Sequence, residues 1–302
     1  PSPRLWAQSS ALVLKKIPSS GEALPVVGIG TARRFDVAAT APERAQIKEV
    51  LRLFAQMGGR VIDTAPSYGQ AEVTVGDLVA ELGNRKAYFL ATKVGTEGRE
   101  AGVAQLEASM QRLKTDTLDL VQVHNLRDFA TQMATLREWK AKGRIRYVGA
   151  STSSDRQYPD FEQAMRAEAM DVIQVDYALD NRNAAERILP LAADRGMAVL
   201  VNLPFGRGRL FQAVQGKPLP EWTKEFDCAS WAQFFLKYIV SHPAVTCAVP
   251  GTAQVKYVTD NLGARAVHED LDRVGGGLRV PPRRGLAGRR VTVDRRRIAR
   301  RV

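Results

Sequence analysis

The sequence of 302 residues predicts an α/β protein, a (β/α)8 barrel of the TIM type with an N-terminal β-hairpin. Eight short apolar runs recur over about 230 residues, each with Val, Ile or Leu on neighbouring positions, a pattern typical of parallel strands buried on both faces. Longer amphipathic segments separate the runs, as in consecutive βα units. A doubly wound open sheet is the second fold that this alternation allows.

The expected hairpin and strands follow from where the apolar runs lie. Ala11–Ile17 and Glu22–Leu24 flank the turn Ser19-Ser20-Gly21, which predicts a β-hairpin over the floor of the barrel. The eight expected strands are Pro25–Gly30, Arg60–Asp63, Tyr88–Lys93, Leu118–His124, Arg146–Ser151, Val172–Val175, Ala198–Asn202 and Thr246–Pro250.

Helices are expected between these strands, and several have readable limits. Thr40-Ala41-Pro42-Glu43 resembles a capping box, which predicts a helix start at Thr40. Asn183 and Glu186 predict another capped start. The first helix has an apolar stripe that Gly58-Gly59 ends, formed by Ile47, Val50, Leu51, Phe54 and Met57. The same spacing recurs in Trp231, Phe234, Phe235, Tyr238 and Ile239.

The positive charge is concentrated at the C-terminal end. Residues 271–302 hold eleven Arg and two Asp, a net charge of +9, which leaves +3 of the total +12 for residues 1–270. We therefore expect a barrel domain over residues 1–270 and a disordered, Arg-rich tail over residues 271–302. A tether to an anionic surface or nucleic acid, and a shifted reading frame, are the alternatives for the tail. For the protein as a whole we expect no nucleic-acid partner.

Other compositional features exclude further classes. A run of about 18 apolar residues is missing, so we expect no membrane-spanning helix. The two cysteines, Cys228 and Cys247, lack the spacing of a zinc site or a disulfide framework, so we expect no metal. We expect a cytoplasmic protein; the alternative is an exported one whose signal peptide has been removed.

Polar side chains stand where the expected strands end, and in a (β/α)8 barrel such positions converge on one site. They are Asp63, Lys93, His124, Ser151, Gln174 and Asn202, and Tyr68 follows Asp63 in the next loop. Taken singly, each has a structural explanation, such as a helix cap or an exposed loop lysine. Taken together they do not, because a Lys and an Asp ending neighbouring buried strands must pair.

A Lys–Asp pair beside a tyrosine has a chemical use. A free tyrosine, with a pKa of about 10, is a poor acid at neutral pH, and a neighbouring ammonium makes it a better one. A neutral histidine at the same mouth can orient a substrate carbonyl. The four residues Asp63, Tyr68, Lys93 and His124 therefore suit polarising a C=O bond while a hydride arrives from a cofactor.

Glycine-rich segments provide candidate phosphate contacts. The sequence has no G-x-G-x-x-G motif after a strand, so it does not indicate a Rossmann site. Pro204-Phe205-Gly206-Arg207-Gly208 follows the seventh expected strand, and Pro250-Gly251-Thr252 follows the eighth. These two loops are the usual phosphate grip of this barrel.

Together these motifs resemble the aldo-keto reductase superfamily, including its bacterial aldo/keto reductases. The resemblance rests on VIDTAPSYG at 61–69, the Thr92-Lys93 pair, DLVQVHN at 119–125, VGAST at 148–152, IQVDY at 173–177, VPGT at 249–252 and DNLGA at 260–264. It extends over roughly residues 12 to 266, in order and without large gaps.

The resemblance implies an NADPH-dependent reduction of aldehydes or ketones to alcohols. It implies a catalytic tetrad of Asp63, Tyr68, Lys93 and His124, with Tyr68 as the general acid. Ser151 and Gln174 match positions that hold the nicotinamide carboxamide. The remaining cofactor positions are Gly30 and Thr31 near the nicotinamide ribose, Asn202 and Phe205 after the seventh strand, and Gly206, Gly251, Thr252 and Asn261 along the pyrophosphate and adenosine.

Three positions depart from the family pattern. Thr152 stands where many members have Asn, and Asn202 stands where an aromatic residue often stacks on the nicotinamide. Tyr257 replaces an Arg that often binds the 2′-phosphate, and Lys256 is the candidate to substitute for it. We therefore expect NADPH, with NADH as the alternative cofactor.

Two main functions remain in competition. The first is an NAD(P)H-dependent oxidoreductase that acts on a small-molecule carbonyl substrate as a monomer or weak homo-oligomer. The alternative is a sensor or regulatory subunit that binds a nicotinamide cofactor on the same barrel with little turnover. A hydrolase that uses Asp63 and Asp176 as paired carboxylates is less favoured, because it leaves Lys93 without a role.

Overall fold

Eight parallel strands form the centre of the protein in a computed structural model that describes residues 13–264. Their order is β10-β9-β8-β7-β6-β5-β4-β3, so each strand pairs with the strands before and after it in the chain. The strands are β3 (Ile29–Gly30), β4 (Val61–Asp63), β5 (Phe89–Val94), β6 (Leu118–His124), β7 (Ile145–Ser151), β8 (Val172–Asp176), β9 (Ala198–Asn202) and β10 (Cys247–Ala248). Each falls at one of the predicted runs. The predicted tail, residues 271–302, lies outside the described residues.

The sheet closes on itself between β3 and β10. Gly28 N donates to Ala248 O at 2.8 Å, and Gly30 N donates to Pro250 O at 2.9 Å. A Cβ on Gly30 would lie 2.7 Å from Val249 O, so only glycine lets the two segments approach this closely. The predicted (β/α)8 barrel is therefore confirmed, and the open sheet is wrong.

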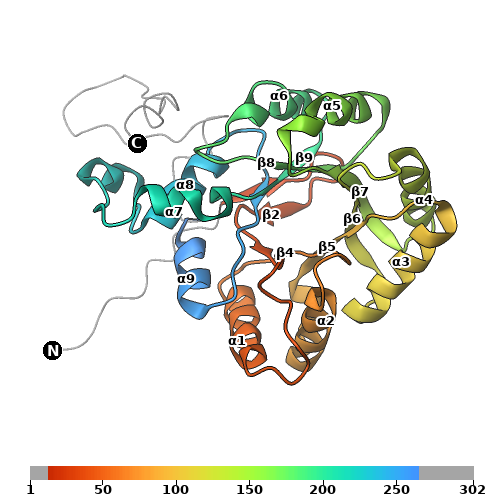
Figure 1. Ribbon diagram of the computed structural model, residues 1–302, viewed down its shortest axis with the longest axis horizontal. Helices are drawn as coiled ribbons and strands as arrows, with labels where there is room; N and C mark the ends of the chain where they lie inside the picture. The colour runs from red at the N-terminus through yellow and green to blue at the C-terminus, as the bar shows by residue number, and fades with distance from the viewer. Residues whose placement is uncertain (1–12, 265–302) are drawn as a thin grey trace.

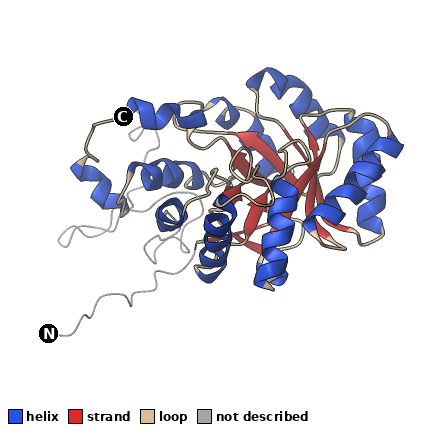
Figure 2. Cartoon of the chain, turned by 60° about the horizontal axis from the view of Figure 1, so that its bottom comes forward, coloured by secondary structure: helices blue, strands red, loops and turns tan. Residues whose placement is uncertain are grey.

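The helices surround the strands (Figures 1 and 2). They are α1 (Glu43–Gln56), α2 (Ala71–Leu82), α3 (Arg99–Leu113), α4 (Phe129–Ala141), α5 (Tyr158–Ala167), α6 (Ile188–Asp194), α7 (Arg209–Ala213), α8 (Trp231–Val240) and α9 (Val255–Gly263). Within the described part of the chain, no helix combines the length and the apolar character that crossing a bilayer requires.

The apolar stripes are confirmed, but two predicted helix starts are wrong. Ile47, Val50, Leu51 and Phe54 are buried on α1 as expected. However, α1 begins after Pro42, which has no side-chain capping bond, because the chain around Thr40 forms a turn instead. Near Asn183 the chain forms a short 3-10 helix, and α6 begins only at Ile188.

The predicted hairpin closes the N-terminal end of the barrel. Its strands are β1 (Leu14–Lys16) and β2 (Ala23–Pro25), which pair antiparallel. Lys15 Nζ donates to the carbonyl oxygens of Val240, His242 and Val245 at 2.7–2.9 Å. These contacts connect the hairpin to the last residue of α8 and to the segment between α8 and β10.

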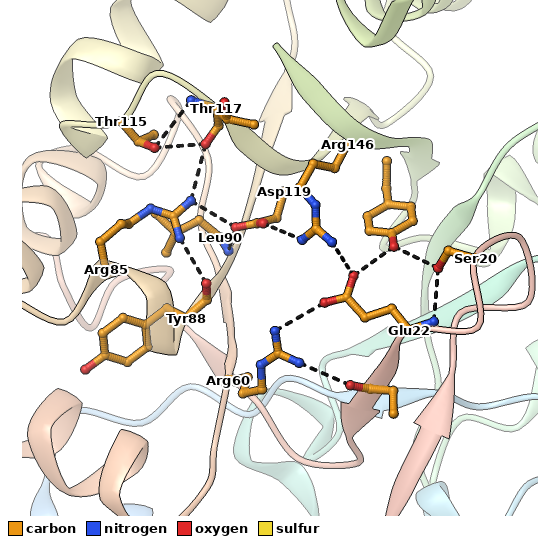
Figure 3. A network of polar contacts seen from close by, with 12 residues as sticks. Ser20, Glu22, Arg60, Arg85, Tyr88, Leu90, Thr115, Thr117, Asp119 and Arg146 are labelled. Atoms are coloured by element: carbon orange, nitrogen blue, oxygen red, sulfur yellow. Dashed lines mark hydrogen bonds and ion pairs between the residues drawn. The ribbon is translucent and has the colours of Figure 1, made fainter. Parts of the chain in front are cut away.

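A charged network joins this hairpin to the strand starts, as Figure 3 shows. Glu22 accepts hydrogen bonds from Arg60 at 3.2 Å, Arg146 at 2.5 Å and the Tyr147 hydroxyl at 2.8 Å. Arg146 also donates to Asp119 at 2.7 Å. The barrel floor is thus held by charge-assisted hydrogen bonds.

The barrel interior changes character from floor to mouth. Its lower part is an apolar cluster that includes hairpin residues: Ile17, Leu24, Val61, Phe89, Ala91, Leu120, Tyr147, Val172, Ala198, Leu200, Cys247 and Val249. A second apolar cluster lies mainly between the strands and the helices. Beyond the first of these clusters, at the C-terminal ends of the strands, the side chains that point into the barrel are polar. They define a candidate site.

Candidate active site

The strand register brings the predicted polar residues to the same end of the barrel. Gly30 is paired with Asp63 across β3 and β4. His124 is paired with Ser151 across β6 and β7, and Ser151 with Gln174 across β7 and β8. Because neighbouring strand ends lie side by side, these residues form one ring around the barrel mouth.

Asp63 and Lys93 form a buried ion pair at the centre of this ring. Lys93 Nζ lies 2.8 Å from Asp63 Oδ1 and 3.0 Å from Oδ2, and it also donates to Thr64 O at 2.9 Å. Gln174 Nε2 donates to Asp63 Oδ1 at 2.8 Å. Since β4 and β8 lie four strands apart in the closed sheet, this last bond crosses the barrel interior. The expected pairing of Lys93 with Asp63 is confirmed.

Tyr68 lies beside the Lys93 ammonium. Lys93 Nζ is 5.1 Å from the centroid of the half-buried Tyr68 ring. Burial lowers the pKa of Lys93, but the interactions with Asp63 and Tyr68 outweigh it, so its pKa lies above the ordinary value. Lys93 therefore carries a full positive charge next to the tyrosine at neutral pH.

His124 completes the group of four. Its ring meets the Tyr68 ring edge to face, with centroids 6.0 Å apart and an interplanar angle of 84°. Burial, followed by the nearby Lys93 charge, lowers the pKa of His124 from 6.5 to about 4. The imidazole is therefore neutral at pH 7 and can offer one N–H donor to a ligand.

The loop that carries Tyr68 is held by Asp36, which the sequence did not single out. Gln70 N donates to Asp36 Oδ1 at 2.8 Å. Gly69 has a φ of +59°, and a Cβ there would lie 2.2 Å from Asp36 Oδ1. Asp36 is an exposed loop residue in a segment with no motif, so no signal in the sequence pointed to it.

Several buried polar atoms near the mouth have no protein partner within the described residues, and two of them lie at predicted cofactor positions. These two are Ser151 Oγ and Asn202 Oδ1. Asn202 Nδ2 donates to Thr152 O at 2.9 Å, which fixes the direction of its amide. A buried polar atom without a partner is costly unless a ligand or water satisfies it, so both atoms point to a polar ligand group.

The loop after β9 has an unusual backbone. Gly206, Arg207 and Gly208 have φ values of +55°, +57° and +95°, and successive residues of this kind can turn backbone N–H groups toward an anion. A cavity of about 190 Å³ lies beside the loop, and its charged lining residues are Asp155, Asp176, Arg207 and Arg209. Phe205 instead packs against Phe211, with ring centroids 4.8 Å apart. Arg207 stands in the predicted glycine-rich segment but is not among the predicted cofactor positions.

The loop after β10 uses several predicted residues to fix its own shape. Asn261 Nδ2 donates to Thr252 Oγ1 at 3.0 Å, which anchors α9 to the loop. Gly251 bridges to Gly30 where the barrel closes. Thr31 donates through both its N–H and its hydroxyl to Asp63 O at 3.0 Å. Lys256 lies over the exposed Tyr257 ring, 4.8 Å from its centroid.

Solved structures similar to this one include enzymes with nicotinamide cofactors. A crystal structure of an aldo/keto reductase from Klebsiella pneumoniae in complex with NADP and acetate has a TM-score of 0.71 and 27% identity, covering 83% of this chain and 89% of that chain. An aldo-keto reductase from the same organism in complex with NADPH has a TM-score of 0.70 and 26% identity, covering 85% and 91%.

Sequence relatives agree with the structures. Methylglyoxal reductase YeaE of Escherichia coli K12 is 31% identical over 261 residues, which cover 84% of this chain and 90% of that protein. Aldo-keto reductase YhdN of Bacillus subtilis 168 is 34% identical over 195 residues, 59% of this chain and 56% of that protein. The model of the aldo/keto reductase family matches residues 26–274, which contain every strand of the barrel. The chain therefore belongs to the aldo/keto reductase family.

Proposed function

We propose that the protein reduces aldehydes or ketones to alcohols, with NADPH as the hydride donor and Tyr68 as the proton donor. The observation that carries this proposal is the buried Lys93–Asp63 pair, whose ammonium lies 5.1 Å from the centroid of the Tyr68 ring at the barrel mouth. Membership of the aldo/keto reductase family and the NADP-bound neighbours support the same chemistry.

Each of the four residues has a distinct part in this reaction. Tyr68 gives its hydroxyl proton to the carbonyl oxygen as negative charge develops there. The Lys93 ammonium stabilises the phenolate that remains, and Asp63, which itself accepts from Gln174, holds that ammonium in place. Neutral His124 donates a hydrogen bond that orients the carbonyl. The reduced nicotinamide, when bound, supplies the hydride to the carbonyl carbon.

The residues around the mouth fit such a cofactor. The unpartnered Ser151 Oγ and Asn202 Oδ1 suit the NH₂ group of a carboxamide, and Gln174 offers its amide oxygen because Asp63 already binds its nitrogen. The Gly206–Gly208 turn and the Arg207 guanidinium suit the negative phosphates, whereas Arg209 is already paired with Asp180 at 2.9 Å. Gly30, Thr31, Gly251, Thr252 and Asn261 shape the remaining wall.

Substitution of Tyr68 tests the assigned acid. Tyr68→Phe removes only the hydroxyl, so we expect the rate of NADPH oxidation with a nitrobenzaldehyde to fall by about 10²- to 10⁴-fold. Cofactor affinity, measured by fluorescence quenching on titration with NADPH, should stay nearly unchanged. Full activity of Tyr68→Phe would show that another group donates the proton.

The same titration separates the cofactors and the competing function. We propose NADPH over NADH because Lys256 lies at the start of α9, beside the position expected for the 2′-phosphate. Tighter quenching by NADPH than by NADH, lost in Lys256→Ala, is the expected result. Asn202, in place of a stacking aromatic, favours the sensor alternative; tight NADPH binding without turnover on any carbonyl compound would support it.

A further inference from the structure

A second buried carboxylate, outside the site, lies close to its two central residues. Glu72 is 1% exposed, and its carboxylate accepts three hydrogen bonds. Thr92 Oγ1 lies 2.5 Å from Oε1, Arg112 Nε lies 2.7 Å from Oε2, and Ser109 Oγ lies 3.2 Å from Oε2. We call these four residues the Glu72 network. A charged side chain buried to this degree needs such partners to be tolerated.

The Glu72 network joins the segment that carries Tyr68 to the strand that carries Lys93. Glu72 is in the first turn of α2, four residues after Tyr68. Thr92 directly precedes Lys93 on β5. Because neighbouring residues of a strand point to opposite faces, Lys93 points into the barrel while Thr92 points outward to α2. One hydrogen bond therefore connects the helix that follows Tyr68 to the outer face of the strand that carries Lys93.

Helix α3 supplies the third side of the network and leaves α2 little freedom. Ser109 and Arg112 both lie on α3. A Cβ on Gly76 of α2 would lie 2.0 Å from Arg112 O, so the two helices touch backbone to backbone at this point. Arg112 also donates to Ser109 Oγ at 3.3 Å, which aligns both donors on Glu72. Helices α2 and α3 and strand β5 thus meet at one carboxylate.

We propose that Glu72 is a positioning residue for the Tyr68–Lys93 pair. By holding Thr92 and the start of α2 together, it fixes the separation between the tyrosine hydroxyl and the lysine ammonium. This inference rests on the proposed function, since it gives the network a part in the proton transfer from Tyr68. Glu72 does not touch the substrate or cofactor positions, so it acts on the rate of the chemical step and leaves binding alone.

Thr92 provides the sharpest test, because it can be changed with little change of shape. Thr92→Val removes the hydroxyl that binds Glu72, whereas Thr92→Ser keeps it. We expect Thr92→Val to lower kcat for nitrobenzaldehyde reduction by about 10- to 100-fold, as a misplacement of under about 1 Å does. KM and the NADPH dissociation constant should change less than about twofold. Thr92→Ser should restore most of kcat.

The pH profile gives a readout that a purely structural role would not change. A general acid must be protonated, so activity falls at alkaline pH. If the ammonium lies farther from the hydroxyl, it promotes loss of that proton less, and the alkaline limb of kcat moves to higher pH. We expect this movement in Thr92→Val and in Glu72→Gln, and we expect Thr92→Ser to follow the wild-type profile.

Asp119→Asn is the matched control. Asp119 is also a buried carboxylate that binds β5, because it accepts from Leu90 N at 2.8 Å, but it lies at the floor of the barrel. This variant should lower the urea midpoint while leaving kcat and the alkaline limb unchanged. If Thr92→Val and Asp119→Asn lower kcat equally and both keep the wild-type limb, the network is only structural and the inference is wrong.

The outcomes separate this inference from the proposed function. If the wild type turns over, Tyr68→Phe does not, and Thr92→Val matches the wild type in kcat and pH profile, only the positioning inference is overturned. If the wild type reduces no carbonyl compound, or Tyr68→Phe keeps its rate, the proposed function fails and the inference fails with it. A slow Thr92→Val with a displaced limb, rescued by Thr92→Ser, supports both.

Discussion

Removal of the Lys93 ammonium is a direct test of the electrostatics at the barrel mouth. Lys93 and Asp63 form the most deeply buried ion pair among residues 13–264, with side chains 1% and 6% exposed. Lys93→Met keeps most of the side-chain volume and removes the charge. The Asp63 carboxylate then keeps only the hydrogen bond from Gln174 of its side-chain partners, and Thr64 O loses its side-chain donor.

The magnitude follows from burial and from the surviving partner. Removing one member of a buried ion pair typically destabilises a protein by about 3–5 kcal/mol, because the other charge stays uncompensated. Gln174 still donates to Asp63, so we expect Lys93→Met to lose about 3 kcal/mol of stability. In Lys93→Met/Asp63→Asn the orphaned charge is absent as well, and more than half of the lost stability should return. Activity should not return, because the ammonium beside Tyr68 is still missing.

Urea unfolding followed by tryptophan fluorescence measures these differences, with the slope m as a check on the denatured state. The pH dependence has a defined sign. Since the pKa of Lys93 in the folded protein lies above its ordinary value of 10.5, its contribution is complete below that value and is lost as pH rises through the folded pKa. Wild-type stability for Lys93→Met, or a double variant no more stable than the single one, would refute this account of the pair.

Two further predictions concern the histidine and the floor. The folded pKa of His124 is lowered from 6.5 to about 4, so folding should weaken as pH falls between these values, by up to about 3 kcal/mol. In His124→Gln the free energy of unfolding, measured in urea at pH 7 and pH 4.5, should differ less between the two pH values than it does in the wild type. An equal difference in both proteins would exclude the histidine as the cause. At the floor, Arg146→Leu removes donors to Glu22 and Asp119 and should destabilise the protein by about 1–2 kcal/mol. NADPH titration should be unaffected, because the floor and the mouth lie at opposite ends; weaker cofactor binding would contradict this separation.

The strands could be predicted because their signal is local. A parallel strand buried on both faces appears as a continuous apolar run, and the six-residue β5 falls on such a run. The two strands at the closure, Ile29–Gly30 and Cys247–Ala248, are shorter than predicted because their ladder is replaced by isolated bridges. The predicted start of α1 was wrong, because the sequence Thr40–Glu43 permits a capping box but does not require one when the helix can begin after Pro42.

The site was predictable only where strand ends define it. Asp63, Lys93 and His124 follow from the rule that polar residues at strand ends converge in a barrel. Asp36 and Arg207 lie in loops, where the backbone path decides which residues come into contact, and their sequence neighbours carry no periodic signal. Glu72 is visible in the sequence as a charge among the apolar residues of α2. Its partners Thr92 and Arg112 lie 20 and 40 positions away, so the contacts themselves could not be predicted.

Strand β5 is the element on which these contacts meet. Asp119 holds the Leu90 amide at its base, Glu72 holds the Thr92 hydroxyl on its outer face, and Asp63 holds Lys93 on its inner face. Three buried carboxylates therefore fix one strand of six residues from three directions. Asp119 anchors the floor end of the strand, whereas Asp63 binds the Lys93 ammonium itself and Glu72 binds the residue next to it.

The candidate phosphate contacts follow other strands. The Gly206–Gly208 turn follows β9, and Gly251 and Thr252 follow β10, next to the seam where the barrel closes. We therefore propose that proton donation and cofactor binding depend largely on separate parts of the barrel, which are linked by the Gln174–Asp63 hydrogen bond and by the two hydrogen bonds from Thr31 to Asp63 O. Substitutions at the mouth end of β5 should therefore act on kcat, and those after β9 and β10 on cofactor affinity. Gln174 is the position where we expect both to change, because its nitrogen donates to Asp63 and its oxygen is the atom that we propose for the nicotinamide carboxamide.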